Sequence, residues 1–95
     1  MGNRPDNEPT AITLYALQTC SHCKNVKKLL QQRGVWFETV YVDMLVGDER
    51  NATLRHLKRI NPAVSFPTLQ VGAKTIVGFK QKEIETALEA SHQHL

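Results

Sequence analysis

The sequence predicts an α/β domain in which helices flank a mixed four-stranded sheet, with the elements in the order β-α-β-α-β-β-α. Three observations support this fold class. Runs rich in β-branched or aromatic residues alternate with segments of helical periodicity, Gly or Pro stands at several joints, and only Gly72-Ala73 separates the last two strand-like runs. A strand–helix–strand unit forms a parallel pair, whereas strands joined by a tight turn pair antiparallel, so the sheet is mixed.

The chain is long enough for one domain. It has 95 residues, of which 41% are hydrophobic and 22% charged, an ordinary balance for a globular protein. Residues 1–9 are polar and contain two prolines. We therefore expect a disordered lead-in at 1–9, a folded domain over 10–91 and a frayed tail at 92–95.

The first strand and the first helix enclose the two cysteines of the chain. Residues 11–17 are mostly apolar and fit a central strand that is buried on both sides. Residues 21–33 have one apolar helical face, which consists of Cys23, Val26, Leu29 and Leu30. We expect Ser21 in the N-cap region of this helix and Gly34 as its C-cap glycine.

The later elements complete the predicted order. They are a strand at 35–43, a helix at 47–60, a strand that begins at Pro67, a strand at 74–77 and a helix at 81–91. Asp48 and Glu49 stand at the positive end of the second helix, and Asn61-Pro62 ends it. The first two strands and the helix between them form a right-handed βαβ unit.

Composition and charge exclude several classes of function. The formal net charge is +3, but the basic residues are spread along the chain and form no block, so nucleic-acid binding is not expected. No apolar run approaches the roughly 18 residues of a membrane span, and the N-terminus lacks the apolar stretch of a signal peptide. We expect a monomer in the cytoplasm. Because this compartment is reducing, the cysteine pair is not expected to be a structural disulfide.

The stretch Cys20-Ser21-His22-Cys23 has the pattern of a dithiol redox site. A helix that starts here points its free N–H groups and its positive dipole end at Cys20, and the N–H groups of His22 and Cys23 are the natural donors to its sulfur. The thiolate is the nucleophile in disulfide exchange, so Cys20 should attack and Cys23 should resolve the mixed disulfide. An inert pair or half a zinc site is the alternative, but zinc needs about four ligands and the other histidines lie in unrelated segments.

Three features stand in an informative order along the chain. They are Cys20-Ser21-His22-Cys23 after the first strand, Ser65-Phe66-Pro67 before the third strand, and Gly78-Phe79 before the last helix. Together they resemble the glutaredoxin group of thioredoxin-fold proteins, over residues 12–88. The resemblance implies a thioredoxin-like (glutaredoxin) fold and a thiol–disulfide oxidoreductase.

The same resemblance implies how the chain would work. The protein would reduce protein disulfides or mixed disulfides through a Cys20–Cys23 dithiol–disulfide cycle. Its cellular role would be electron transport and redox homeostasis. It would need no bound cofactor and no metal. It further implies that Pro67 is cis. The expected substrate-binding residues are Ser65, Phe66, Pro67, Gly78 and Phe79.

Departures from the family pattern bear on the electron donor. Leu17 stands where glutathione-dependent members often carry lysine, and Gly78-Phe79-Lys80 replaces a Gly-Gly pair followed by a capping Asp. This pattern is similar to glutaredoxin-like proteins reduced by thioredoxin reductase, so thioredoxin reductase and glutathione both stay open as donors. Ser21 replaces the usual proline, which keeps open an alternative reading, an iron–sulfur cluster held between two subunits.

His22 is a candidate for tuning the thiolate. A strong periplasmic oxidant of similar chemistry also carries His just before its second cysteine, and its reduced form is stabilised. We therefore hypothesise that His22 favours the reduced thiolate and raises the reduction potential. The alternative is a surface histidine with no effect on the potential.

Overall fold

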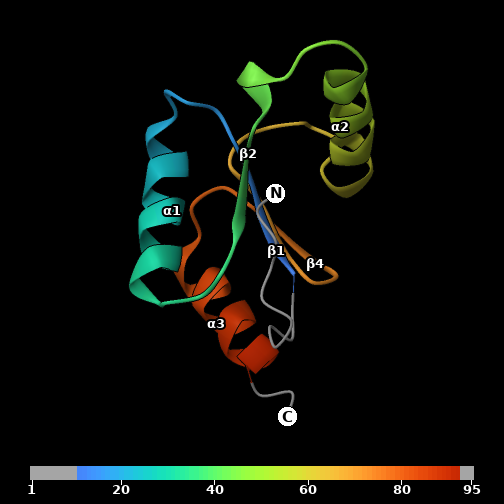
Figure 1. Cartoon of the computed structure of the whole chain (residues 1–95). Coiled ribbons are helices and arrows are strands. Elements are labelled where there is room, and N and C mark those ends of the chain that lie inside the picture. The colour runs from blue at the N-terminus through green and yellow to red at the C-terminus, as the bar shows by residue number, and fades with distance from the viewer. Residues whose placement is uncertain (1–10, 93–95) are drawn as a thin grey trace.

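The computed structural model describes residues 11–92 and has the predicted order of elements (Figure 1). Its strands are β1 (Ile12–Ala16), β2 (Glu38–Tyr41), β3 (Thr68–Val71) and β4 (Lys74–Val77), and its helices are α1 (Ser21–Gln32), α2 (Gly47–Ile60) and α3 (Gln81–His92). The expected lead-in at 1–9 and all of the expected tail except His92 lie outside the described residues. Within the described range, no helix combines the length and the apolar character needed to cross a membrane.

The four strands form one sheet in the order β2-β1-β3-β4. β1 pairs in parallel with β2 and antiparallel with β3, and β3 pairs antiparallel with β4, so the sheet is mixed as predicted. At its centre, Leu14 lies opposite Leu69, which lies opposite Ile76. Helices α1 and α3 lie on one side of the sheet and α2 lies on the other (Figure 1).

Apolar side chains form a cluster on each face of the sheet. The larger cluster includes Leu14 of β1 and the buried side chains of α1 and α3, and the smaller one is made of Tyr15, Val42 and Leu57. Leu14 and Tyr15 are neighbours in β1 and belong to different clusters, because successive side chains of a strand point to opposite faces. The prediction of a central strand buried on both sides is therefore confirmed.

Helix α1 follows the predicted amphipathic pattern. Its buried residues are Cys23, Val26, Leu29 and Leu30, the four that the sequence assigned to its apolar face. After the helix, Gly34 has φ +68° and its N–H donates to the Gln31 carbonyl over 3.1 Å. This left-handed conformation suits glycine, so the predicted C-cap glycine is confirmed.

The second strand is shorter than the predicted range 35–43. Only Glu38–Tyr41 pair with β1, in the register from Thr13 opposite Glu38 to Ala16 opposite Tyr41. β1 ends there, so the next residues have no strand to pair with, and Val42–Met44 form a short 3-10 turn, η1. Val35 is buried in the larger cluster although it is outside the strand.

Leu69→Ala tests how far the central sheet residues determine stability. Leu69 is 1% exposed, so truncation leaves a cavity in the middle of the sheet and should lower the free energy of unfolding by about 2–5 kcal/mol. Urea denaturation followed by circular dichroism measures the change. The exposed Glu89→Ala on α3 is the control and should change it by less than about 0.5 kcal/mol. Equal small changes in both variants would contradict the assigned core.

Candidate active site

The two thiols occupy different environments at the start of α1. Cys20 is the N-cap residue of the helix, with φ −82° and ψ 117°, and its side chain is partly exposed. Cys23 is one turn further on and only 2% exposed. Both are free thiols. The geometry therefore presents one sulfur to an incoming molecule and keeps the other behind it.

The sulfur of Cys20 acts as the helix cap. The N–H of Cys23 donates to Cys20 Sγ over 3.2 Å, as predicted, and the Cys20 carbonyl accepts from the Lys24 N–H over 3.1 Å. The sequence placed Ser21 in the N-cap region, but Ser21 is the first helical residue, because the preceding sulfur already accepts a free N–H of the first turn. Among the described residues, the His22 N–H donates no hydrogen bond to this sulfur.

Burial keeps Cys23 in the thiol form. It raises the pKa of Cys23 to about 12, and the hydrogen bond with Cys20 and the negative charge of Asp43 act in the same direction. The backbone of Leu17 acts in the opposite direction and lowers this pKa, but more weakly than burial raises it. Cys23 must therefore lose a proton before it can act as a nucleophile.

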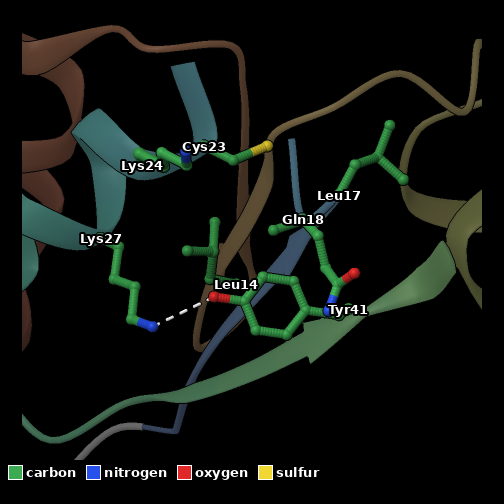
Figure 2. Close-up of a pocket in the computed structure, with 8 residues that line it drawn as sticks. Leu14, Leu17, Gln18, Cys23, Lys24, Lys27 and Tyr41 are labelled. Carbon is green, nitrogen blue, oxygen red and sulfur yellow. Dashed lines mark hydrogen bonds between the residues drawn. The ribbon is translucent and has the colours of Figure 1, made fainter. Parts of the chain in front are cut away.

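A small cavity lies beside Cys23 (Figure 2). Its volume is about 40 Å³, which is room for water. Lys27 and Tyr41 belong to its wall, and Lys27 Nζ donates to Tyr41 Oη over 3.1 Å. The remaining lining residues are Leu14, Ala16, Leu17, Gln18 and Lys24. Lys27 and Tyr41 belong to α1 and β2, and nothing in the sequence indicates that their side chains meet.

The Phe66–Pro67 peptide bond is cis, as predicted. Pro67 is fully buried, Ser65 is exposed, and Phe66 is partly buried and packs against the same apolar cluster as Cys20. The loop thus offers Ser65 and Phe66 to an approaching molecule, and Pro67 lies beneath them.

Asn61 and Thr68 hold this loop from below. The Asn61 side-chain amide donates to the Ser65 carbonyl and to Ser65 Oγ, each over 3.2 Å, and to Thr68 Oγ1 over 3.0 Å. Thr68 Oγ1 donates in turn to the Ser65 carbonyl over 2.7 Å. Asn61 is 5% exposed and Thr68 is 0% exposed, so the bond between these two side chains is shielded from water. From the sequence, Asn61 appeared only as part of a helix stop.

Gly78 and Phe79 lie in different surroundings. Gly78 has φ +87°, which favours glycine, and its N–H donates to the Pro67 carbonyl over 2.9 Å, so it is joined to the cis-proline loop. Phe79 is partly buried against the larger cluster and borders a surface hollow with Lys28 and Gln32 of α1. It is not among the residues that line the cavity beside Cys23.

Two further residues complete the surroundings of the dithiol. The side chain of His22 is exposed, and among residues 11–92 it makes no hydrogen bond to either sulfur. Asp43, in the 3-10 turn, accepts the Gln18 N–H over 3.2 and 3.4 Å and so anchors the segment that leads to Cys20. Sequence reasoning gave Asp43 no such role, because the contact joins residues 25 positions apart. In the described part of the chain, no group of three His, Cys, Asp or Glu side chains could hold a metal ion.

Comparison with known proteins agrees with this geometry. The glutaredoxin family model matches residues 12–76. The glutaredoxin of Methanosarcina mazei Go1 is 48% identical, with a TM-score of 0.78, and the match covers 82% of this chain and 77% of that one. The methanoredoxin of Methanosarcina acetivorans is also 48% identical with a TM-score of 0.78, over 82% and 83%. The glutaredoxin-like NrdH-redoxin of Escherichia coli is 26% identical with a TM-score of 0.64, over 80% and 92%.

A helix-capping thiol followed by a buried thiol, with a cis-proline loop on a mixed four-stranded sheet, defines the thioredoxin-like class of dithiol proteins. Within that class, the chain belongs to the glutaredoxin family, since the family model spans most of its length. The fold and the family expected from the sequence are both confirmed. Family and fold together support thiol–disulfide oxidoreductase activity.

The raised pKa of Cys23 predicts its reactivity in the Cys20→Ser variant, where Cys23 is the remaining thiol. Burial, the largest cause of the shift, persists there. Iodoacetamide labelling, followed by mass spectrometry, should accelerate about tenfold per pH unit between pH 8 and 10, because the thiolate fraction grows tenfold per unit below the pKa. An unstructured peptide with a single cysteine is the control, and its labelling rate levels off above about pH 9. The same levelling for Cys23 would contradict its burial.

Asn61→Ala tests the support of the cis-proline loop. The change removes three hydrogen bonds. The buried Thr68 hydroxyl and the Ser65 carbonyl each lose a hydrogen-bond donor. The free energy of unfolding should fall by about 1–3 kcal/mol in urea denaturation. The matched control, Asn51→Ala, changes an exposed residue of α2 and should cost less than about 0.5 kcal/mol. A cost for Asn61→Ala as small as the control's would mean that the network does not support the loop.

Proposed function

We propose that the protein reduces disulfides in other proteins through a Cys20–Cys23 dithiol–disulfide cycle. The observation that carries the proposal is the asymmetry of the two thiols, since Cys20 is partly exposed at the helix N-terminus and Cys23 is buried one turn behind it. An accessible thiol is suited to attack on an external disulfide. A shielded thiol is suited to react only with its neighbour.

The cycle has two exchange steps. The Cys20 thiolate attacks one sulfur of the substrate disulfide, which forms a mixed disulfide and releases the other substrate sulfur as a thiolate that takes up a proton. Cys23 then loses its proton and attacks Cys20 Sγ, which forms the Cys20–Cys23 disulfide and releases the second substrate thiol. Two electrons pass from the dithiol to the substrate. The cycle needs no bound organic cofactor and no metal ion.

The cis-proline loop is the proposed binding site for the substrate polypeptide. Ser65 is exposed and Phe66 is partly exposed next to the apolar cluster that Cys20 joins, whereas Pro67 is buried. An extended peptide can lie along such a loop as an added strand. Ser65 and Phe66 would then contact the substrate directly, with Pro67 and Gly78 fixing the shape of the loop. Phe79, at the hollow beside α1, would contact a part of the substrate farther along.

The electron donor proposed first is a thioredoxin reductase. Leu17 is partly buried against the smaller apolar cluster and provides no cation for a glutathione carboxylate, and Phe79 occupies the place of a second glycine. The similar NrdH-redoxin is described as having a thioredoxin-like activity profile. Glutathione is the second donor to be tested. The proposed setting is the reducing cytoplasm, where a monomer with a free dithiol can cycle.

The function is tested with insulin and hydroxyethyl disulfide as substrates. Cys20→Ser should abolish reduction of both, because no accessible nucleophile remains. Cys23→Ser should make the first bond but not resolve it, so a mixed disulfide with the substrate should accumulate and be visible by mass spectrometry without reductant. Unchanged turnover in Cys20→Ser, or no mixed disulfide in Cys23→Ser, would contradict the cycle.

The same assay separates the donors. NADPH with thioredoxin reductase should support faster turnover than NADPH with glutathione reductase and glutathione. Ser21→Ala is the control variant, since it leaves both cysteines in place. A faster glutathione arm would reverse the assignment of the donor and leave the dithiol cycle intact.

A further inference from the structure

A groove of about 300 Å³ lies beside the C-terminal half of α2. Its lining residues are Leu54, Arg55, Lys58 and Val64, and we call it the α2 groove. Leu54 and Val64 are partly buried and provide an apolar floor, whereas Arg55 and Lys58 are exposed and provide a charged rim. A hollow of this size and character has room for one bulky apolar side chain.

The α2 groove is connected to the dithiol by apolar contacts. Leu54 and Val64 pack against the same small cluster as Leu17, whose carbonyl accepts the N–H of Cys20. Phe66 packs against this cluster and also against the larger one, where Cys20 packs. The groove and Cys20 are thus connected through Leu17 and through Phe66, and an extended substrate strand that lay along Phe66 would advance about 3.3 Å per residue.

The backbone at the edge of the groove is unusual. Val64 has φ +49°, a left-handed conformation that β-branched residues rarely adopt. The Val64 N–H donates to the Asn61 carbonyl over 2.8 Å, which closes the turn that holds this conformation. Such conformations occur preferentially at binding sites, where the surroundings maintain them.

The rim of the groove belongs to a cationic stretch of α2. From Arg50 to Ile60 the helix carries four cations, Arg50, Arg55, Lys58 and Arg59, and no acidic residue. Among the described residues, the ion pair joins Arg33 to Glu85, and neither residue belongs to α2. The α2 cations therefore meet no protein carboxylate within the described range, and their field attracts an acidic partner.

We propose that the α2 groove docks a segment of the protein substrate in which a bulky apolar side chain is flanked by Asp or Glu, a few residues from the reacting cysteine. The apolar side chain would lie on Leu54 and Val64, and the acids would meet Arg55 and Lys58. The inference rests on the proposed function, since it names the class of protein disulfide that the dithiol reduces. Glutathione carries no bulky apolar side chain and does not match the floor.

Binding of labelled peptides that contain serine in place of cysteine tests the docking without redox chemistry. One peptide carries Leu between Asp and Glu, the second carries Leu between two lysines, and the third carries Ala between Asp and Glu. In fluorescence anisotropy at low salt, wild-type protein should bind the acidic Leu peptide about tenfold more tightly than the lysine peptide. Arg55→Glu with Lys58→Glu should remove this preference, and 0.5 M NaCl should weaken it.

Two further variants serve as controls. Lys74→Glu with Lys82→Glu makes the same change of net charge on β4 and α3 and should leave the peptide affinity within about twofold. Val64→Asn keeps a residue that tolerates positive φ but removes the apolar side chain, so the preference for Leu over Ala should fall about threefold. Circular dichroism and thermal unfolding establish that each variant is folded.

Several outcomes overturn the docking site. Equal binding of the three peptides by wild-type protein would do so, as would equal losses in Arg55→Glu/Lys58→Glu and Lys74→Glu/Lys82→Glu. Loss of S-methylglutathione binding in Arg55→Glu/Lys58→Glu, with peptide binding intact, would assign the groove to a small thiol instead. Failure of the proposed function is separate, because it appears as no reduction of hydroxyethyl disulfide by wild-type protein, whatever the peptides do.

Discussion

The hydrogen bond from the Cys23 N–H to the Cys20 sulfur sets the start of α1 and, with it, the geometry of the candidate site. An N-cap side chain must accept a free N–H of the first turn, and here a thiol takes the place of the usual oxygen. The cap residue stays outside the helix, while the residue three positions later faces inward with Val26 and Leu30. One bond thus places one sulfur at the surface and the other in the core.

The difference between the two thiols follows from their burial. Water solvates an exposed thiolate, whereas the surroundings of Cys23 disfavour its charged form and raise its pKa to about 12. A thiol of this kind reacts slowly with outside reagents near neutral pH but lies next to Cys20. The cavity lined by Lys27 and Tyr41 has space for water beside Cys23. A water molecule there would be in position to accept the proton that the Cys23 thiol loses. In the proposed cycle, this difference in solvent access would separate attack by Cys20 from resolution by Cys23.

Much of the fold and the centre of the site could be predicted from local patterns. The apolar face of α1, the glycine at its end and the antiparallel β3–β4 pair each depend on neighbours within a few residues. The extent of β2 could not be predicted, because it ends where its partner β1 ends. Asn61 and Asp43 were missed for a related reason. Asn61 reads as a helix stop in sequence, and its contacts with Ser65 and Thr68 exist only once the loop has turned back.

By itself, the sequence determined the order of the elements, the two-residue gap between Cys20 and Cys23, and their position at the junction of a strand and a helix. These features follow from periodicity and capping, which act over one or two helical turns. Tertiary structure decided the rest. It decided that Phe66 contacts both apolar clusters, that Lys27 meets Tyr41, and that α2 presents its cations beside Val64. Such contacts join residues of different helices, strands and loops, and only the packing of both helix layers on the sheet brings them together.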